Sequence, residues 1–447
     1  MMRAMEVKHL KTLFHALLAA RFMYPFYQNP MNSLYSDPQR HWNNADSLFS
    51  PTFDRGMDMT GYQVFLYFIR YATDDSPFGI AFVSGVLCVL LPWLWSRIAR
   101  EMFRDERFAL LCGICVGIMP SLLFIYAFTM VETLLLNVVA AGILLSLIYL
   151  REKSASVFLY QTAMLTFAAL TKFAAVPVSV MFLGFSIWRA NPGAKILLTA
   201  SVIAALMINA AGVRSAISAH FFSPFGILDF ARIYSKSDAK KIVIRYNNGA
   251  EWYQSPALEH IPLAPLSGWK SKRSGEVEIQ IDLLKGREDW TREIARFPVK
   301  PENYLRQIEE NFIIFFFDFS WPEHMLGGIQ GPLIFASRWV WFPLTVFIVC
   351  GLAGYRPQEY RRKDGKWHRH WLQGEEAAQT FFVLLTLAVV GAMLVQYTGI
   401  MEGRYRKPVE PLLIMSAFIV VRKRFFPPRK TAPKQTTRKR KTNAPSS

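Results

Sequence analysis

Charged residues and cysteines are both scarce in this 447-residue chain. Only 19% of its residues are Asp, Glu, Lys or Arg, against 52% hydrophobic residues, which excludes a disordered chain and an ordinary soluble domain. Its four cysteines lie within apolar runs, which excludes a small disulfide-rich domain. Several runs of sixteen to twenty-four residues carry no charge, a length that crosses the ~30 Å hydrocarbon core of a bilayer. The sequence therefore predicts an all-α polytopic membrane protein.

Ten membrane spans are predicted from the charge-free stretches. They are residues 9–27, 77–96, 108–127, 133–150, 155–172, 173–188, 196–213, 332–354, 377–400 and 408–421. The first span is interrupted by Lys11, His15 and Arg21. The stretches on either side of Lys172 fit one long broken helix or two helices, and the return loops elsewhere favour two.

Basic residues alternate along the chain in a way that predicts which loops face the cytoplasm. The net charge is +18, and Lys and Arg gather in segments 3–11, 97–107, 151–153, 189–195, 356–369 and 422–447. Cytoplasmic loops carry the excess of Lys and Arg in membrane proteins. The alternation predicts that both termini are cytoplasmic, in a multi-pass protein of a cell inner membrane. The basic tail is then a signal for topology and anionic membrane lipids, and no nucleic acid partner is expected.

Four segments follow from this topology. They are an N-terminal membrane module (1–213) with an outer loop (28–76), a small extracytoplasmic domain (214–330), a C-terminal membrane module (331–421) and a basic cytoplasmic tail (422–447). Within the extracytoplasmic domain, helices are predicted around 287–296 and 302–313, and irregular chain around 255–275.

The first outer loop contains an unusual density of charge directly after a span. One interpretation of Asp37 followed by Pro38 is structural, because an acid before proline is a common helix start. A helix from Pro38 would also bring Asp37, Arg40 and His41 onto neighbouring turns of one face. The stretch "GYQVFLYFIRY" then predicts a helix in the membrane interface, with Arg70 extended to the surface.

Four stretches together resemble the GT-C membrane glycosyltransferases. They are "SDPQRHW" after the first span, "MPSLLFIYAFTMVETLLL", "LTFAALTKFAAVPV" and "GRYRKPVEPLLIM". Within that superfamily the chain is most similar to the branch of protein O-mannosyltransferases and lipid A aminoarabinose transferases. The resemblance covers most of the membrane portion but not residues 214–330. The family often has two adjacent acids where this chain has Asp37 and Pro38.

The resemblance implies an inverting transfer of sugar from a polyprenyl-phosphate donor to an acceptor at the outer membrane face. Such a reaction needs a carboxylate for the acceptor proton and cations for the departing phosphate. Asp37 is the candidate base. Arg404, Arg406, Lys172 and Arg40 are the candidate phosphate-binding residues.

Each of these cations has an alternative role. The arginines at 404 and 406 lie in a short outer loop, against the usual inside bias, where they either bind phosphate or pair with Glu402, Glu410 or lipid head groups. Lys172 lies at the outer end of its span, where a charged ammonium is costly unless it is paired or at the interface, and it either binds the donor phosphate or extends to the interface.

The remaining candidates line the site or approach the acceptor: His41, Asp58, Gln63, Glu132 and Tyr405. Glu132 has a structural alternative, because "TMVE" predicts a capping box between Thr129 and Glu132. Tyr405 is also typical of an interfacial aromatic belt. One histidine without a second ligand at useful spacing does not indicate a metal site, so no cofactor is assigned and metal dependence stays open.

The sequence thus predicts a glycosyltransferase whose acceptor is a protein, a lipid or a glycan. Two rivals remain. One is another outer-face enzyme, a polysaccharide polymerase or ligase. The other is a lipid or sugar transporter, which would place its charges near the midplane rather than at one face.

Overall fold

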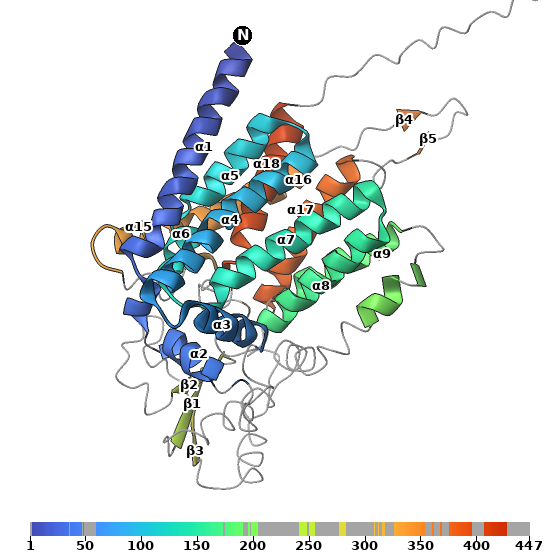
Figure 1. The fold of residues 1–447 in the computed structure, drawn as a ribbon. Helices are drawn as coiled ribbons and strands as arrows, with labels where there is room; N and C mark the ends of the chain where they lie inside the picture. Colours follow the sequence, from blue (N-terminus) through green and yellow to red (C-terminus); the bar gives the residue numbers. More distant parts are fainter. Residues whose placement is uncertain are drawn as a thin grey trace, which may run out of the picture.

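The chain folds as a bundle of helices in a computed structural model (Figure 1). The residues that the structure describes are 2–34, 36–46, 48, 60–172, 175–190, 195–196, 198–203, 241–247, 250–254, 277–282, 308, 312, 315–317, 326–353, 360–361, 367–368, 375–395 and 406–426. Four sets of predictions lie wholly or mostly outside them: the two helices and irregular chain of the extracytoplasmic domain, most of the span 196–213, the tail from 427, and several site residues considered below.

Helices make up most of the described chain. They are α1 (Met2–Tyr27), η1 (Pro30–Ser33), α2 (Ser36–Asp46), α3 (Thr60–Thr73), α4 (Pro77–Phe103), α5 (Glu106–Ile118), α6 (Pro120–Leu123), η2 (Phe124–Ala127), α7 (Val131–Glu152), α8 (Ala155–Thr171), α9 (Val176–Trp188), α15 (Gln330–Ser337), η7 (Arg338–Val340), α16 (Trp341–Ala353), α17 (Glu375–Leu394) and α18 (Glu410–Phe425). The stretches on either side of Lys172 form two helices, α8 and α9, rather than one.

Three described helical segments are long and apolar enough to cross a membrane. They are Pro77–Phe103, Val131–Glu152 and Gln330–Ala353, and α5 with α6 and η2 makes a fourth if that bent pair is one span. Shorter apolar helices cover Ala155–Thr171, Val176–Trp188 and Ala378–Leu394. The protein is therefore a helical multi-pass membrane protein, while the number of ten spans stays a prediction.

The segment predicted as one straight span over 108–127 is broken. Helix α5 ends at Ile118, and the chain from Pro120 to Ala127 leaves it at 80°. Met119, the residue before Pro120, is extended with φ −66° and ψ 121°. Proline disfavours the helical conformation in the residue before it, and this accounts for the break. Segment α6–η2 is called the bent segment below.

Basic and polar residues from distant helices meet at one end of the bundle, the Asp105 end. Lys11 of α1 pairs with Glu106 at 2.9 Å, and Arg422 of α18 pairs with Asp105 at 3.0 Å. Nearby, Arg151 of α7 pairs with Glu101 at 2.5 Å. The start of α1 and the end of α18 therefore lie at the same end of the bundle. The basic residues there belong to segments that the sequence predicts to face the cytoplasm.

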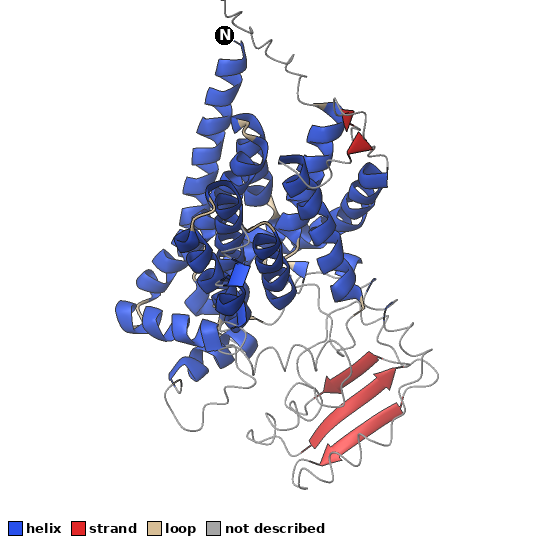
Figure 2. Ribbon diagram, turned by 90° about the vertical axis from the view of Figure 1, so that its right-hand side faces the viewer, coloured by secondary structure: helices blue, strands red, loops and turns tan. Residues whose placement is uncertain are grey.

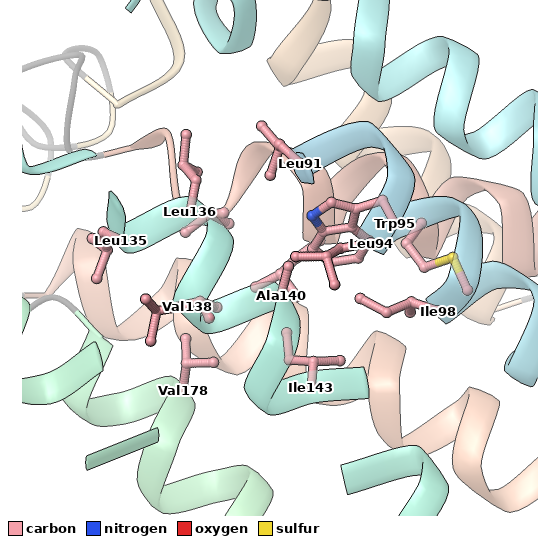
Figure 3. Close-up of a cluster of buried hydrophobic side chains, with 14 of the residues drawn as sticks. Leu91, Leu94, Trp95, Ile98, Leu135, Leu136, Val138, Ala140, Ile143 and Val178 are labelled. Carbon is pink, nitrogen blue, oxygen red and sulfur yellow. The ribbon is translucent and has the colours of Figure 1, made fainter. Parts of the chain in front are cut away.

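Apolar side chains of α4 and α7 fill the centre of the bundle (Figure 3). The residues shown there are Leu91, Leu94, Trp95 and Ile98 of α4, Leu135, Leu136, Val138, Ala140 and Ile143 of α7, and Val178 of α9. In contrast, Leu333, Phe335 and Trp339 on α15 and η7 are 42–55% exposed. Exposed aromatic and aliphatic side chains on a spanning helix are what a lipid-facing surface requires.

Two small antiparallel sheets, which the sequence did not predict, accompany the helices. The larger contains β1 (Lys241–Asn247), β2 (Ala250–Gln254) and β3 (Val277–Asp282) in the order β2-β1-β3. It lies beyond the end of the bundle opposite the Asp105 end (Figure 2). The smaller pairs β4 (Tyr360–Arg361) with β5 (Trp367–His368).

Candidate active site

Helices α2 and α3 lie at the end of the bundle opposite Asp105, called the Lys172 end (Figure 1). Asp37 is the second residue of α2, so the helix begins two residues before its predicted start at Pro38, and Asp37 precedes His41 by one helical turn. Arg40 is exposed on the same helix. The side chain of Asp37, and Asp58, Arg404 and Tyr405 entirely, lie outside the described residues.

His41 and Gln63 are joined across α2 and α3. The Nδ1 atom of His41 lies 3.0 Å from Nε2 of Gln63, and the two side chains are 2% and 0% exposed. The His41 ring also meets the edge of the Tyr62 ring, with centroids 5.2 Å apart. A buried imidazole held on two sides has a fixed orientation, which suits a group that must orient a neighbour. These two predicted site residues are therefore brought together.

Tyr62 connects α3 to α7. Its phenol is buried, and burial raises its pKa well above the usual value, with a further rise from the negative charge of Glu132 and a smaller opposing effect from a hydrogen bond with Thr133. The phenol therefore stays protonated between His41 and Glu132. Sequence reasoning missed Tyr62 because it is one aromatic among many in an apolar stretch.

Glu132 and Lys172 form a buried ion pair between α7 and α8. Their side chains are 0% and 8% exposed. Lys172 follows the last residue of α8 in an extended conformation, with φ −160° and ψ 135°, which turns the chain toward α9. Lys172 is therefore paired with an acid rather than extended to the interface.

The capping box predicted for Thr129 and Glu132 is wrong. The N-cap of α7 is Met130, which makes no side-chain capping bond, and the Thr129 hydroxyl has no hydrogen-bond partner among the described residues. Glu132 is directed into the bundle toward Lys172 instead, because a carboxylate with no exposure to water needs a cation more than a backbone amide.

Arg70 does not simply extend to the surface. It pairs with Asp46 at 2.6 Å and Asp75 at 2.7 Å, and its guanidinium lies 4.3 Å from the Trp42 ring centroid. It thereby clamps the end of α2 onto α3. The Arg70–Asp75 hydrogen bond is the main cause that lowers the pKa of Asp75 from its ordinary value.

A second buried polar cluster lies where α18 begins. Arg406 donates from Nε to Glu410 at 2.9 Å and from another guanidinium nitrogen to the Phe315 carbonyl, while the Ser121 hydroxyl of the bent segment donates to Glu410. Arg406, Lys407 and Glu410 are at most 1% exposed. The alternative in which Arg406 pairs with Glu410 is therefore realised. Among the described residues, no group of three metal-ligating side chains is present.

The cluster at the Lys172 end lies in a segment that resembles a known family, and the cluster at the start of α18 contacts that segment through Ser121. The family described as dolichyl-phosphate-mannose-protein mannosyltransferase (PMT) matches residues 25–224, which carry α2, α3, Glu132 and Lys172. Residues 25–224, which are similar to this family, are called the PMT segment below. PMT is a GT-C family, so the resemblance predicted from the motifs is confirmed. No curated protein and no solved structure matches the chain.

The PMT match indicates a glycosyltransferase in a membrane. It ends at residue 224, so it does not include Arg406 or Glu410. Those residues reach the PMT segment through Ser121, which lies inside it. Glu410 was weighed from the sequence only as a partner of the loop arginines, and Ser121 was missed because a lone serine in an apolar stretch carries no signal.

Proposed function

We propose that this protein is an inverting glycosyltransferase that moves a sugar from a polyprenyl-phosphate donor to an extracytoplasmic acceptor. The observation that carries the proposal is the meeting of buried polar groups from α2, α3, α7 and α8 at the Lys172 end, within the PMT segment. Ionisable groups inside a membrane bundle are costly, and they are retained where they serve a site. Their position at one end, away from the midplane, favours this function over transport.

The orientation is part of the proposal. We assign the Asp105 end to the cytoplasm because it collects Lys11, Arg151 and Arg422, as the positive-inside rule requires. The Lys172 end then faces the outside of a cell inner membrane, where a lipid-linked donor would have its phosphate at the interface.

In this proposal the acceptor hydroxyl oxygen attacks the anomeric carbon of the sugar, and the bond from that carbon to the phosphate oxygen breaks. Asp37 takes the hydroxyl proton, and the lipid phosphate leaves with an added negative charge. His41, one turn after Asp37 and fixed by Gln63, holds α2 in place for this step. The acceptor is a protein, lipid or glycan hydroxyl.

The cations divide into two kinds. Arg404 and Arg406 are proposed to contact the donor phosphate, Arg404 through the two parallel bonds that a guanidinium fork makes to phosphate oxygens, and Arg406 while it stays paired with Glu410. Arg40, exposed on α2, is proposed to contact the phosphate from the other side. Lys172 is proposed to act through its pair with Glu132, by compensating the carboxylate whose negative charge acts on Tyr62.

The test is sugar transfer by the full chain in nanodiscs. Purified protein is incubated with a panel of polyprenyl-phosphate sugars and, separately, with nucleotide sugars. Wild type should transfer from a polyprenyl-phosphate sugar, and Asp37→Asn should lower the rate about a hundredfold or more, as expected for a lost general base. The matched control is Asp74→Asn, an exposed acid in the turn after α3.

Two results would contradict this proposal. Transfer from nucleotide sugars alone would reject the donor class. Normal turnover by Asp37→Asn would reject the base, and Asp58→Asn would then be measured in the same assay.

A further inference from the structure

Arg21 is a fully buried arginine that the proposed reaction does not use. It lies in α1 and is 1% exposed. Its guanidinium donates to three backbone carbonyls, those of Cys88 at 2.7 Å, Gly117 at 2.7 Å and Leu122 at 2.9 Å. No acid pairs with it among the described residues. A charge in a membrane bundle without a counter-ion needs an explanation.

Each of the three carbonyls lies where a helix is interrupted. The Cys88 carbonyl of α4 would normally accept from residue 92, but Pro92 has no N–H. Gly117 lies in the last turn of α5, and Leu122 in the last turn of α6. Carbonyls in a last helical turn have no donor within their own helix. Arg21 therefore supplies donors to acceptors that the proline in α4 and the break at Met119 leave open.

Glycine allows α1 to approach closely enough for this contact. A Cβ atom at Gly117 would lie 2.5 Å from the Leu17 side chain, and one at Gly85 would lie 2.7 Å from the Phe22 carbonyl oxygen. Both separations are too short for a real side chain. The close packing of α1 on α4 and α5 thus depends on residues that have no Cβ.

The bent segment held by Arg21 carries the residue that reaches Arg406. Ser121 of α6 donates to Glu410, and Glu410 accepts from Arg406 Nε at 2.9 Å. The second half of the bent segment, η2, is held by Ser84 of α4, whose hydroxyl donates to the Tyr126 carbonyl at 2.9 Å. The Arg21 guanidinium also lies 5.7 Å from the Tyr126 ring centroid.

We propose that Arg21 is a positioning residue, which fixes the 80° bend after α5 and thereby sets the orientation of Arg406 through Ser121 and Glu410. The second half rests on the proposed function, in which Arg406 contacts the donor phosphate. Loss of the Arg21 contacts should therefore weaken donor binding and leave acceptor binding unchanged.

Arg21→Lys is the informative variant. It keeps the charge, but one ammonium nitrogen cannot reach three carbonyls that a planar guanidinium spans. The matched control is Arg97→Lys, an exposed arginine on α4 near the Asp105 end. A second variant combines Arg21→Lys with Pro92→Ala, which restores an N–H to the Cys88 carbonyl and so removes one of the three demands on residue 21.

Two measurements are made on the full chain in nanodiscs. Hydrogen–deuterium exchange of the amides over 119–128 should be faster in Arg21→Lys than in wild type and Arg97→Lys, and should slow again in the double variant. In the transfer assay, Arg21→Lys should raise the KM for donor about tenfold, the factor expected for one lost hydrogen bond to a charged group, with the acceptor KM unchanged.

The outcomes separate the two proposals. Unchanged exchange over 119–128 in Arg21→Lys, or no slowing in the double variant, would overturn the positioning role even if transfer is normal. Faster exchange with an unchanged donor KM would overturn the link to Arg406. If wild type transfers no sugar from any donor, the proposed function fails, and exchange still decides whether Arg21 fixes the bend. If Arg21→Lys alone does not fold, the variant that combines it with Pro92→Ala is measured in its place. That variant should fold and exchange its amides over 119–128 at close to the wild-type rate, and failure to do so would overturn the positioning role.

Discussion

Lys172, at the end of α8, and Glu132, in the first turn of α7, form an ion pair that is closed off from water, with side chains 8% and 0% exposed. The pair joins the start of α7 to the end of α8. Breaking a buried pair by removing one partner leaves an uncompensated charge, whereas removing both charges does not.

We predict that Lys172→Met lowers the free energy of unfolding by about 3–5 kcal/mol, because Glu132 is left buried and charged. Glu132→Gln combined with Lys172→Met should recover most of this loss. Thermal unfolding in detergent measures both. Arg151→Met is the control: Arg151 is paired at the exposed Asp105 end, where such pairs contribute about 1 kcal/mol or less. Equal losses in the single and double variants would show that the charge pair is not the cause.

The hydroxyl of Ser121 should matter more than that of a serine bonded within its own helix. Ser121 donates to Glu410, whereas Ser146 donates to the Gly142 carbonyl of the same helix at 2.8 Å. We expect Ser121→Ala to lower stability by about 1.5–3 kcal/mol, the range for a hydrogen bond to a charged group. It should also raise the donor KM. Ser146→Ala should lower stability less than Ser121→Ala does and should leave the donor KM unchanged. Equal effects of the two variants would contradict the prediction.

Gly61 fixes how closely α3 approaches α8. A Cβ atom there would lie 2.9 Å from backbone atoms of Leu170 and Thr171, next to Lys172. Gly61→Ala should therefore destabilise the protein by about 1–3 kcal/mol and reduce transfer, because backbone cannot move aside as a flexible side chain can. Gly184→Ala is the control, since nothing lies within 4 Å of its Cβ position. Unfolding and transfer assays on the pair decide the prediction, which normal behaviour of Gly61→Ala would refute.

The Arg70 clamp should weaken in acid. The Arg70–Asp75 hydrogen bond lowers the pKa of Asp75 below its ordinary value of 3.8 in the folded protein. The contribution of the Arg70–Asp75 pair to folding stability is therefore fully present above pH 3.8. It is lost as the pH falls through the lowered pKa that Asp75 has in the folded protein. Because Asp75 is 45% exposed, we expect about 1 kcal/mol or less.

Hydrogen–deuterium exchange of the α2 amides at pH 5 and at pH 3 measures this loss. The protected fraction at the two pH values is compared after correction for the intrinsic exchange rates. Arg70→Gln should show reduced protection at pH 5 and little further change at pH 3. A variant that retained the full acid response would show that another group causes it.

The sequence predicted the helical membrane class and the positions of most described helices, including α3. These follow from properties of single residues summed along the chain, since hydrophobic length and basic flanks need no partner to take effect. The break at Met119 was missed, although Pro120 marked it, because the apolar run continues across it without a charge. Strand β3 was missed although residues 277–282 alternate between apolar and polar, and β4 and β5 were missed because two residues are too few to show a period.

What the sequence by itself determined is therefore which segments are apolar enough to enter a membrane and which charged residues flank them. Tertiary structure alone decided how those charges are satisfied. Lys172 meets an acid 40 residues away, Arg21 meets carbonyls 67, 96 and 101 residues away, and Ser121 meets Glu410 across 289 residues. The cost of an unsatisfied buried group is fixed by its chemistry, but the partner that removes this cost depends on which helices pack together.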